Sequence, residues 1–242
     1  MKTTTSMALA AILLALSSCC IDDDGFFGHD CEDGFGPEVE VVLNMPQFHS
    51  IVLKNNIDVN ISQGNFFEVV AVGEENIIEL LELDVQNGVW DIEFERCVGE
   101  HDVKLFITVP DIRLLSIQGS GDIFAETFLE TQDLTLRISG SGDMCLGAFA
   151  ETVDAKITGS GDIELEGNAQ DLDLRISGSG DFKAFPFITQ NADVRISGSG
   201  DASVHVLELL EVNISGSGNV YFKGNPQLVI DITGSGDVID AN

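Results

Sequence analysis

The chain is poor in basic residues. It has 11 Lys and Arg against 41 Asp and Glu in 242 residues, which gives a formal net charge of −30. Such a surface repels the phosphates of nucleic acid and the headgroups of anionic membranes. Charge-driven binding to either partner is therefore excluded, whereas a soluble, exposed surface that gathers cations is compatible with this charge.

Long apolar runs are scarce as well. The run Ala8–Leu16 follows Lys2 and is too short to span a bilayer, which is typical of a secretion signal over residues 1–18. Residues 16–19 read LSSC and resemble a bacterial lipobox, so we predict cleavage before Cys19 and lipidation of Cys19. An ordinary secretory signal with a chance cysteine is the alternative.

Residues 19–38 have no hydrophobic periodicity and are rich in glycine and acidic residues, so we expect a flexible tether. Its acidic run, Asp22–Asp24, resembles the surface-export signal of Bacteroidota lipoproteins, and a plain solvated linker fits equally well. We predict an outer-membrane lipoprotein that faces outward, with a periplasm-facing orientation as the alternative. The lipid would be its only membrane contact.

The chain has five cysteines but no Cys-x-x-Cys motif. Cys31 and Cys97 are one possible disulfide pair. The four histidines have no recognisable ligand spacing, which argues against a zinc site.

One phrase, Gly-Ser-Gly-Asp, organises the second half of the chain. It starts at residues 119, 140, 159, 178, 198 and 234, and occurs as Gly-Ser-Gly-Asn at residue 216. A period of about 19 residues is typical of a stacked repeat architecture.

Apolar residues alternate with polar ones before each phrase. An isoleucine precedes every Asp or Asn by five positions: Ile117, Ile138, Ile157, Ile176, Ile196, Ile214 and Ile232. Period-two alternation predicts strands with one buried face. The glycines share the parity of the inward residues, so we expect a sharp bend or a close backbone approach at each corner.

These features predict an all-β fold, a right-handed parallel β-helix or β-solenoid over residues 111–242. Each coil would be a strand, a glycine corner, a second short strand and a variable return; a flat meander sheet is the alternative. Residues 39–110 also read as strands, with a hairpin at Asn87-Gly88 and a short helical turn at 76–81. We expect this N-terminal region to supply irregular first coils or a small sheet that caps the solenoid.

Several segments resemble a known family. They are Phe48…Ile51…Asn55-Asn56-Ile57-Asp58-Val59-Asn60-Ile61, Val85…Gly88…Trp90-Asp91-Ile92, Leu105…Val109-Pro110, Ile117-Gln118-Gly119-Ser120-Gly121-Asp122 and Ile214 to Val238. Together they resemble the head GIN domain of putative auto-transporter adhesins, over roughly residues 47–240. The resemblance implies a β-helical fold and a cell-envelope location, and it brings no catalytic residues.

The corner carboxylates form the most distinctive row. Its members are Asp122, Asp143, Asp162, Asp181, Asp201 and Asp237, with Asn219 in the sixth place. Stacked about 5 Å apart, adjacent carboxylates would repel by about 0.9 kcal/mol in water, which bound Ca²⁺ would relieve. The alternative, which also suits Asn219, is that each side chain accepts hydrogen bonds from backbone N–H groups of its corner. We prefer this structural role and expect no cofactor, with Ca²⁺ as the exception.

Two more charged rows point outward by parity. They are a basic row, Arg137, Lys156, Arg175 and Arg195, and an acidic row, Asp154, Asp173, Asp193 and Glu211. Opposite charges on adjacent strands predict a charge-compensated face. An anion-binding strip is the alternative.

Catalysis needs unlike residues that converge in one cleft, whereas these rows recur in every coil, which is typical of structural residues. The repeat is broken at Cys145, Phe185-Pro186-Phe187, His205, Asn213 and Tyr221. Of these, Phe185 and Phe187 are candidates for an exposed contact patch.

We therefore predict a non-catalytic, adhesin-like binding or structural module that meets a glycan or an envelope or host protein. The alternatives are a β-helical polysaccharide lyase and a calcium-stabilised scaffold. The last coil has no evident cap, so end-to-end association is a further possibility.

Overall fold

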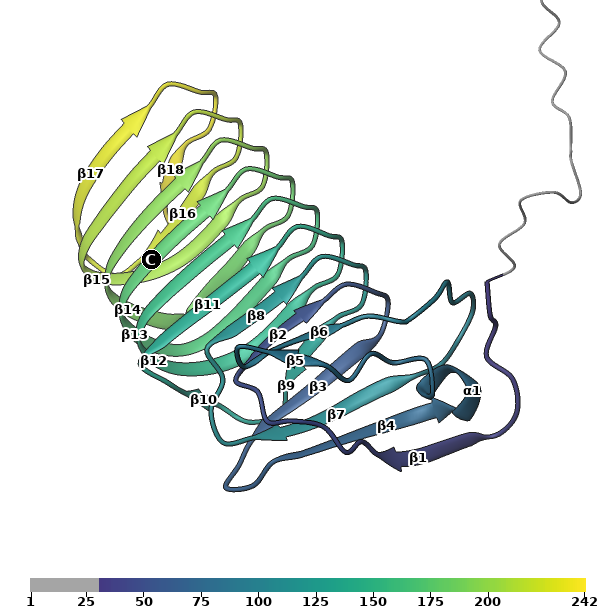
Figure 1. Ribbon diagram of the computed structural model, residues 1–242. Helices are drawn as coiled ribbons and strands as arrows, with labels where there is room; N and C mark the ends of the chain where they lie inside the picture. Colours follow the sequence, from purple (N-terminus) through teal and green to yellow (C-terminus); the bar gives the residue numbers. More distant parts are fainter. Residues whose placement is uncertain (1–30) are drawn as a thin grey trace, which may run out of the picture. The chain divides into compact units, whose positions relative to one another are not determined.

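The computed structural model describes residues 31–242, which form one compact unit (Figure 1). The predicted signal peptide, the predicted lipidation site at Cys19 and most of the predicted tether lie outside the described residues. Within the described part of the chain, no helix is long and apolar enough to cross a membrane.

The described unit is almost entirely β, with one short helix, α1 (Glu75–Ile78). The strands are β1 (Glu38–Val42), β2 (Ser50–Leu53), β3 (Asp58–Gln63), β4 (Glu68–Glu74), β5 (Val85–Gln86), β6 (Val89–Ile92), β7 (Lys104–Val109), β8 (Leu114–Ile117), β9 (Ile123–Ala125), β10 (Leu129–Glu130), β11 (Asp133–Ile138), β12 (Met144–Ile157), β13 (Ile163–Ile176), β14 (Phe182–Ile196), β15 (Ala202–Ile214), β16 (Val220–Lys223), β17 (Gln227–Ile232) and β18 (Val238–Asp240).

The predicted parallel β-solenoid is confirmed. Strands β11 to β15 pair in parallel, each with the strand one coil further along, and β15 continues onto β16 and β17 (Figure 1). The expected variable return is absent from the coils of β12 to β15. Each of these strands runs through 13 to 15 residues, although the alternation of buried and exposed side chains is interrupted at the bend. In β12, for example, the buried positions change from Met144, Leu146 and Ala148 to Val153, Ala155 and Ile157.

The predicted isoleucine row lies in register through the stack. Ile138 pairs with Ile117 and Ile157, and the pairing continues to Ile232. The row also reaches back beyond the repeats, since Leu53 pairs with both Ile117 and Ile92. From Ile92 to Ile214 each member is at most 1% exposed, so the row forms the continuous core.

The N-terminal region is threaded out of chain order. Strands β2 and β3 lie between the coil of β6 and β7 and the coil of β8 and β9, so the first coil in sequence is the second in space. Antiparallel strands close this end: β5 pairs with β6, β4 with β7, and β1 with β4. The region therefore supplies both irregular coils and a cap, as expected. Asn87 (φ 53°) and Gly88 (φ 76°) form the predicted hairpin turn.

The corner glycines are required by the coil beneath them. A Cβ on Gly159 would overlap the carbonyl oxygen of Gly140, and one on Gly178 would overlap that of Gly159. The expected close backbone approach is thus between successive corners. The first stacked corner carries Asn55 and Ile57 at the positions that pair with glycines in the next coil, because no glycine corner lies beneath it.

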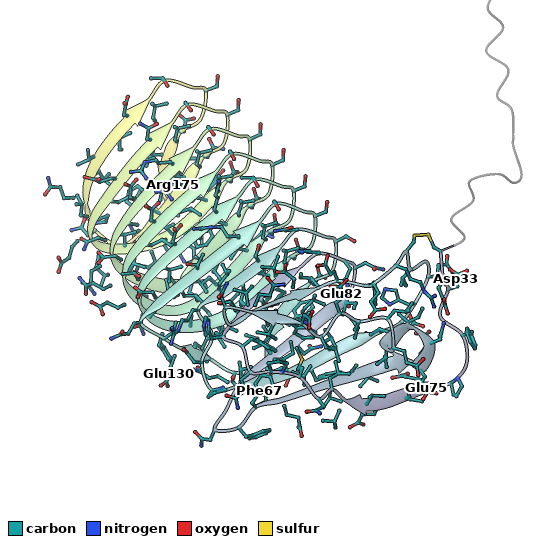
Figure 2. The ribbon with its side chains drawn as sticks, viewed as in Figure 1. Asp33, Phe67, Glu75, Glu82, Glu130 and Arg175 are labelled. Atoms are coloured by element: carbon teal, nitrogen blue, oxygen red, sulfur yellow. A yellow bond between two sulfur atoms is a disulfide. The ribbon has the colours of Figure 1, made fainter. Side chains whose placement is uncertain are left out.

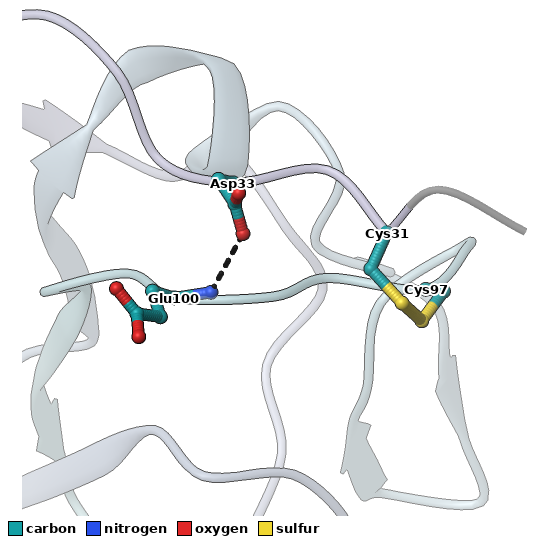
Figure 3. Close-up of a disulfide and its surroundings, with 4 residues drawn as sticks. All are labelled: Cys31, Asp33, Cys97 and Glu100. Atoms are coloured by element: carbon teal, nitrogen blue, oxygen red, sulfur yellow. Dashed lines mark hydrogen bonds between the residues drawn. A yellow bond between two sulfur atoms is a disulfide. The ribbon is translucent and has the colours of Figure 1, made fainter. Parts of the chain in front are cut away.

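The disulfide considered from the sequence, Cys31–Cys97, is present and spans 66 residues (Figure 3). Beside it, the Glu100 N–H donates to Asp33 Oδ1 at 3.0 Å, and the Glu32 N–H donates to the Cys97 carbonyl at 3.0 Å. These contacts fasten the segment before β1 to the loop between β6 and β7.

Candidate functional site

The corner carboxylates hold successive coils together. Oδ1 of Asp143 accepts the backbone N–H of Asp162 at 2.7 Å, and Oδ1 of Asp162 accepts that of Asp181 at 2.7 Å. Asn219 performs the same task, since its Oδ1 accepts the N–H of Asp237 at 3.0 Å. The structural role takes a different form from the one expected, because the donor lies in the following coil rather than in the same corner.

The row begins one coil before the repeats. The Asp122 N–H donates to Asp58 Oδ1 at 3.3 Å, and Asp122 Oδ1 in turn accepts the Asp143 N–H at 2.7 Å. Sequence reasoning missed Asp58 because its corner reads Asn-Asn-Ile-Asp rather than Gly-Ser-Gly-Asp. Aligning Leu53 with Ile117 would have identified it.

No group of three or more His, Cys, Asp or Glu side chains within residues 31–242 is arranged to hold a metal ion. One carboxylate oxygen of each of the five predicted ligands from Asp122 to Asp201 already accepts a backbone N–H. Asp162 also binds Lys183 Nζ through its second oxygen, at 2.8 Å. Binding of Ca²⁺ by this row of carboxylates stays an alternative prediction.

The outward basic and acidic rows form a connected ion-pair network. Arg137 binds Asp154 through two guanidinium nitrogens, at 2.8 and 2.7 Å. Arg175, labelled in Figure 2, binds Asp173 at 2.7 Å and lies 3.6 Å from Asp154, which links adjacent coils. The hydrogen bond from Arg137 lowers the pKa of Asp154. These contacts fit the charge-compensated face.

A groove of about 500 Å³ lies over the first halves of β12, β13 and β14. One row of outward residues crosses it in register: Cys145, Glu164, Lys183 and Ser203. The groove reaches the point where β14 has one residue more than β13 between Glu164 and Gly167, a bulge that contains Pro186. Proline has no N–H to donate, so the ladder is interrupted there.

Two titratable groups of this groove, Cys145 and Lys183, have raised pKa values. Burial raises the pKa of the Cys145 thiol, and the carboxylates of Glu164 and Glu166 raise it further. The hydrogen bond to Asp162 raises the pKa of Lys183, and that to Glu164, at 3.3 Å, adds to it. A protonated thiol and a protonated amine are a poor nucleophile and a poor base at neutral pH.

The predicted contact patch of Phe185 and Phe187 stays a prediction for Phe185 and is contradicted for Phe187. Phe185 lines the groove, and Lys223 Nζ lies 4.7 Å from its ring centroid. Phe187 is wrong as an exposed residue: it is 1% exposed, because the bulge turns its side chain into the core.

The exposed aromatic pair beside the groove is Phe128 and Phe149. Their rings stack with centroids 4.8 Å apart and 13° between planes, and each remains about 40% exposed. The Phe128 ring covers Gly147, which lines the groove, so a Cβ on Gly147 would lie 2.9 Å from the ring. Sequence reasoning missed the pair, although Phe149 occupies an outward position of the strand pattern.

The other residues that break the repeat do not converge into one site. His205 and Tyr221 lie on outward positions of the coils formed by β15 and β16, and Ser203 pairs with Tyr221 at the end of the groove row. Asn213 pairs with Arg195 and Asp231 at the open side of the charged network. Their separation leaves the groove and the phenylalanine pair as the candidate binding site.

Solved structures share the fold. A putative adhesin from Bacteroides fragilis NCTC 9343 has a TM-score of 0.81 at 21% identity, covering 85% of this chain and 98% of its own. A structure named putative lipid binding protein, from Parabacteroides distasonis ATCC 8503, has a TM-score of 0.73 at 20% identity, covering 86% and 99%. A putative adhesin from Parabacteroides merdae ATCC 43184 has a TM-score of 0.69 at 22% identity, covering 86% and 98%.

No curated protein sequence matches the chain. A family model does match, over residues 47–226, which is most of the solenoid together with its threaded N-terminal coils. The chain therefore belongs to the family described as putative auto-transporter adhesin, head GIN domain.

Proposed function

We propose that the protein is a non-catalytic adhesin-like module of the cell envelope and that it binds a glycan along the groove and the Phe128–Phe149 pair. One observation carries the proposal: a mainly apolar groove lies where the repeat is broken, directly beside an exposed stacked aromatic pair. Structural repeats need neither feature.

The chemistry of the groove suits a sugar chain. Glu164, Lys183 and Ser203 offer acceptors and donors for hydroxyl groups along one row, at the spacing of adjacent β-strands. The rings of Phe128 and Phe149 offer an apolar surface with an electron-rich face, against which the C–H groups of a sugar ring pack. A repetitive polymer meets several such contacts at once, so weak contacts add up.

The protonation states of Cys145 and Lys183 support a binding role. In the groove, the raised pKa values of Cys145 and Lys183 leave both groups protonated at neutral pH. Within the described residues, the ion pairs of Arg137, Arg175 and Arg195 recur from coil to coil, rather than gathering unlike groups around one reacting atom.

The envelope location is the other half of the proposal. It rests on the secretion signal over residues 1–18 and the lipobox that ends at Cys19. Incorporation of radiolabelled palmitate into the wild-type chain, with none into Cys19→Ser, supports the anchor. Equal labelling of the two chains would overturn it.

The binding test uses the full chain with Cys19→Ser and Cys20→Ser, applied to an array of polysaccharides, envelope proteins and lipid vesicles. Vesicles are included because a solved structure of this fold is named a lipid binding protein. We expect polysaccharide binding that falls at least about tenfold in Phe149→Ala, since removing a stacked ring costs about 1.4 kcal/mol or more.

Phe66→Ala is the matched control, because Phe66 is 57% exposed and does not line the groove. Equal loss in both variants, or binding to vesicles alone, would overturn the glycan assignment. Release of reducing or unsaturated sugars from the polysaccharides would overturn the non-catalytic assignment.

A further inference from the structure

The last coil leaves part of the core row uncovered. Leu228, Ile230 and Ile232 continue the rows of Leu210, Val212 and Ile214, which are at most 3% exposed. In the last coil the same positions are 39 to 45% exposed, because no further coil of the described chain covers them. This end carries an apolar edge, whereas the opposite end is closed by β1, β4 and β5 (Figure 1).

The backbone at this edge is also ready to pair. The Thr233 N–H donates to the Ile214 carbonyl at 2.8 Å, back toward the preceding coil. Backbone groups alternate in direction along a strand, so the N–H and C=O groups of Leu228, Ile230 and Ile232 point to the open edge. The residues that carry the uncovered side chains therefore carry the unpaired backbone groups.

We propose that a second copy of this chain covers the edge, with β17 of each copy paired antiparallel about a two-fold axis through Ile230. In this register Ile230 lies opposite Ile230 of the partner subunit, and Leu228 lies opposite the partner's Ile232. All three uncovered side chains are then matched in one arrangement, which continues the core from one copy into the other. Moving the register by two residues would leave one of them facing Pro226 or a turn residue.

The charges of β17 agree with this register. Its only charged residue, Asp231, falls opposite the partner's Val229, so no carboxylate of β17 faces another. The strand is thus complementary to itself, which is the condition for a two-fold interface. A strand of a different protein would need its own matching pattern, and nothing in β17 selects one.

The closed end limits the assembly to two copies. In head-to-tail stacking, the open edge of β17 in one copy would meet β1 and β5 of the next copy. These two strands pair antiparallel with their neighbours and do not belong to the repeat. A tail-to-tail pair covers the open edge of β17 in both copies, so neither β17 is left to bind a third copy. The proposal is independent of what the groove binds, because the groove lies over the first halves of β12 to β14.

The test is sedimentation velocity of the full chain with Cys19→Ser and Cys20→Ser, at a series of concentrations and salt levels. We expect a monomer–dimer equilibrium that tightens with added salt, because salt screens the repulsion between two strongly acidic chains. A monomer at all concentrations, or a growing series of larger species, would overturn the proposal.

Substitutions at Val229 test the register without touching the core, since this side chain points outward and is 49% exposed. Val229→Lys places an ammonium opposite the partner's Asp231 twice in each dimer, and should tighten it about two- to thirtyfold. Val229→Asp places a carboxylate there and should weaken it by a similar factor. Equal effects of the two variants would overturn the register.

Ile230→Cys, in a chain that also carries Cys145→Ser, provides a direct readout. Opposed residues at a two-fold axis lie about 4.5–5.5 Å apart between their Cβ atoms, so a short bifunctional thiol reagent should join them into a covalent dimer. Val229→Cys should cross-link much less, and Phe66→Lys should leave the equilibrium unchanged. Failure of Ile230→Cys to cross-link in a chain that dimerises would place the interface elsewhere.

Discussion

The two ends of the solenoid solve the same problem differently. At the N-terminal end, the chain leaves the repeat, adds three antiparallel strands and inserts its first coil between two later ones. At the other end, the repeat continues unchanged to β17 and β18 and leaves core residues exposed. A repeat can extend itself but cannot terminate itself, since every coil offers the same edge as the one before.

The comparison extends to the corners. Inside the stack a corner lies on another corner and requires glycine, whereas the first stacked corner carries Asn55 and Ile57.

Gly178→Val should have the largest effect. Its Cβ would overlap the Gly159 carbonyl and lie 2.8 Å from the Thr158 carbonyl carbon, both of which are backbone atoms that cannot move alone. We expect a loss of about 3 kcal/mol or more in the free energy of unfolding, measured by urea denaturation. Ser179→Ala, in the same corner, should change it by less than about 0.5 kcal/mol. Equal stability of the two variants would refute the stacking explanation.

Removal of the Cys31–Cys97 disulfide should come next. The bond closes a loop across 66 residues and fastens the segment before β1 to the cap. The double variant Cys31→Ser, Cys97→Ser should lose about 2–4 kcal/mol, seen as a lower melting temperature. Cys145→Ser is the control, because this thiol is free and exposed. An unchanged melting temperature in the double variant would mean that strand pairing alone holds the cap in place.

Substitutions of Asp181 separate the hydrogen bond from the charge. Asp181→Ala leaves the Asp201 N–H without its acceptor, so we expect a loss of about 1 kcal/mol. Asp181→Asn keeps an acceptor, as Asn219 does, and should be neutral or slightly stabilising because it removes one charge from a stacked row.

The same variants distinguish the calcium scaffold when melted with Ca²⁺ and with a chelator. A melting temperature that rises strongly with Ca²⁺ in the wild-type chain, and much less in Asp181→Asn, would mean that the row binds metal. Equal melting temperatures with Ca²⁺ and with chelator are expected if the carboxylates only accept backbone hydrogen bonds.

Removing the charge of Asp154 or of Asp193 should change the free energy of unfolding least, and the two changes should have opposite signs. The hydrogen bond from Arg137 lowers the pKa of Asp154, so its stabilising effect is present above the ordinary pKa and is lost as the pH falls through the lowered one. Burial raises the pKa of Asp193 more than its ion pair with Arg195 lowers it, and Asp173 and Glu211 add to the increase. Its charge therefore costs stability until the pH falls through the raised pKa.

At about pH 7 we therefore expect Asp154→Asn to lose a few tenths of a kcal/mol and Asp193→Asn to lose nothing or gain slightly, in urea melts. Because both side chains are partly exposed, these differences should shrink as the carboxylates protonate toward about pH 3. Losses of equal size in both variants would mean that the rows act only as a sum of exposed pairs.

Much of the fold followed from local pattern. The alternation around Ile157 and Ile176 predicts strands that bury one face, and the regular spacing of the phrases predicts their parallel register. The Asn87-Gly88 turn was readable because its backbone needs positive φ angles. The groove was harder to predict from the sequence. Pro186 marked a break in the repeat but did not indicate a bulge that turns Phe187 inward.

The repeat, the strands, the inward row and the acidic surface can be read from the sequence alone, because each follows from residue types and their spacing. Two features are visible only in the folded chain: the insertion of β2 and β3 between later strands, and the hydrogen bond that each corner carboxylate accepts from the following coil. These features join residues that are far apart in the chain. Their free energy comes from contacts that no local pattern specifies, and a repeating pattern is least informative where the repeat stops.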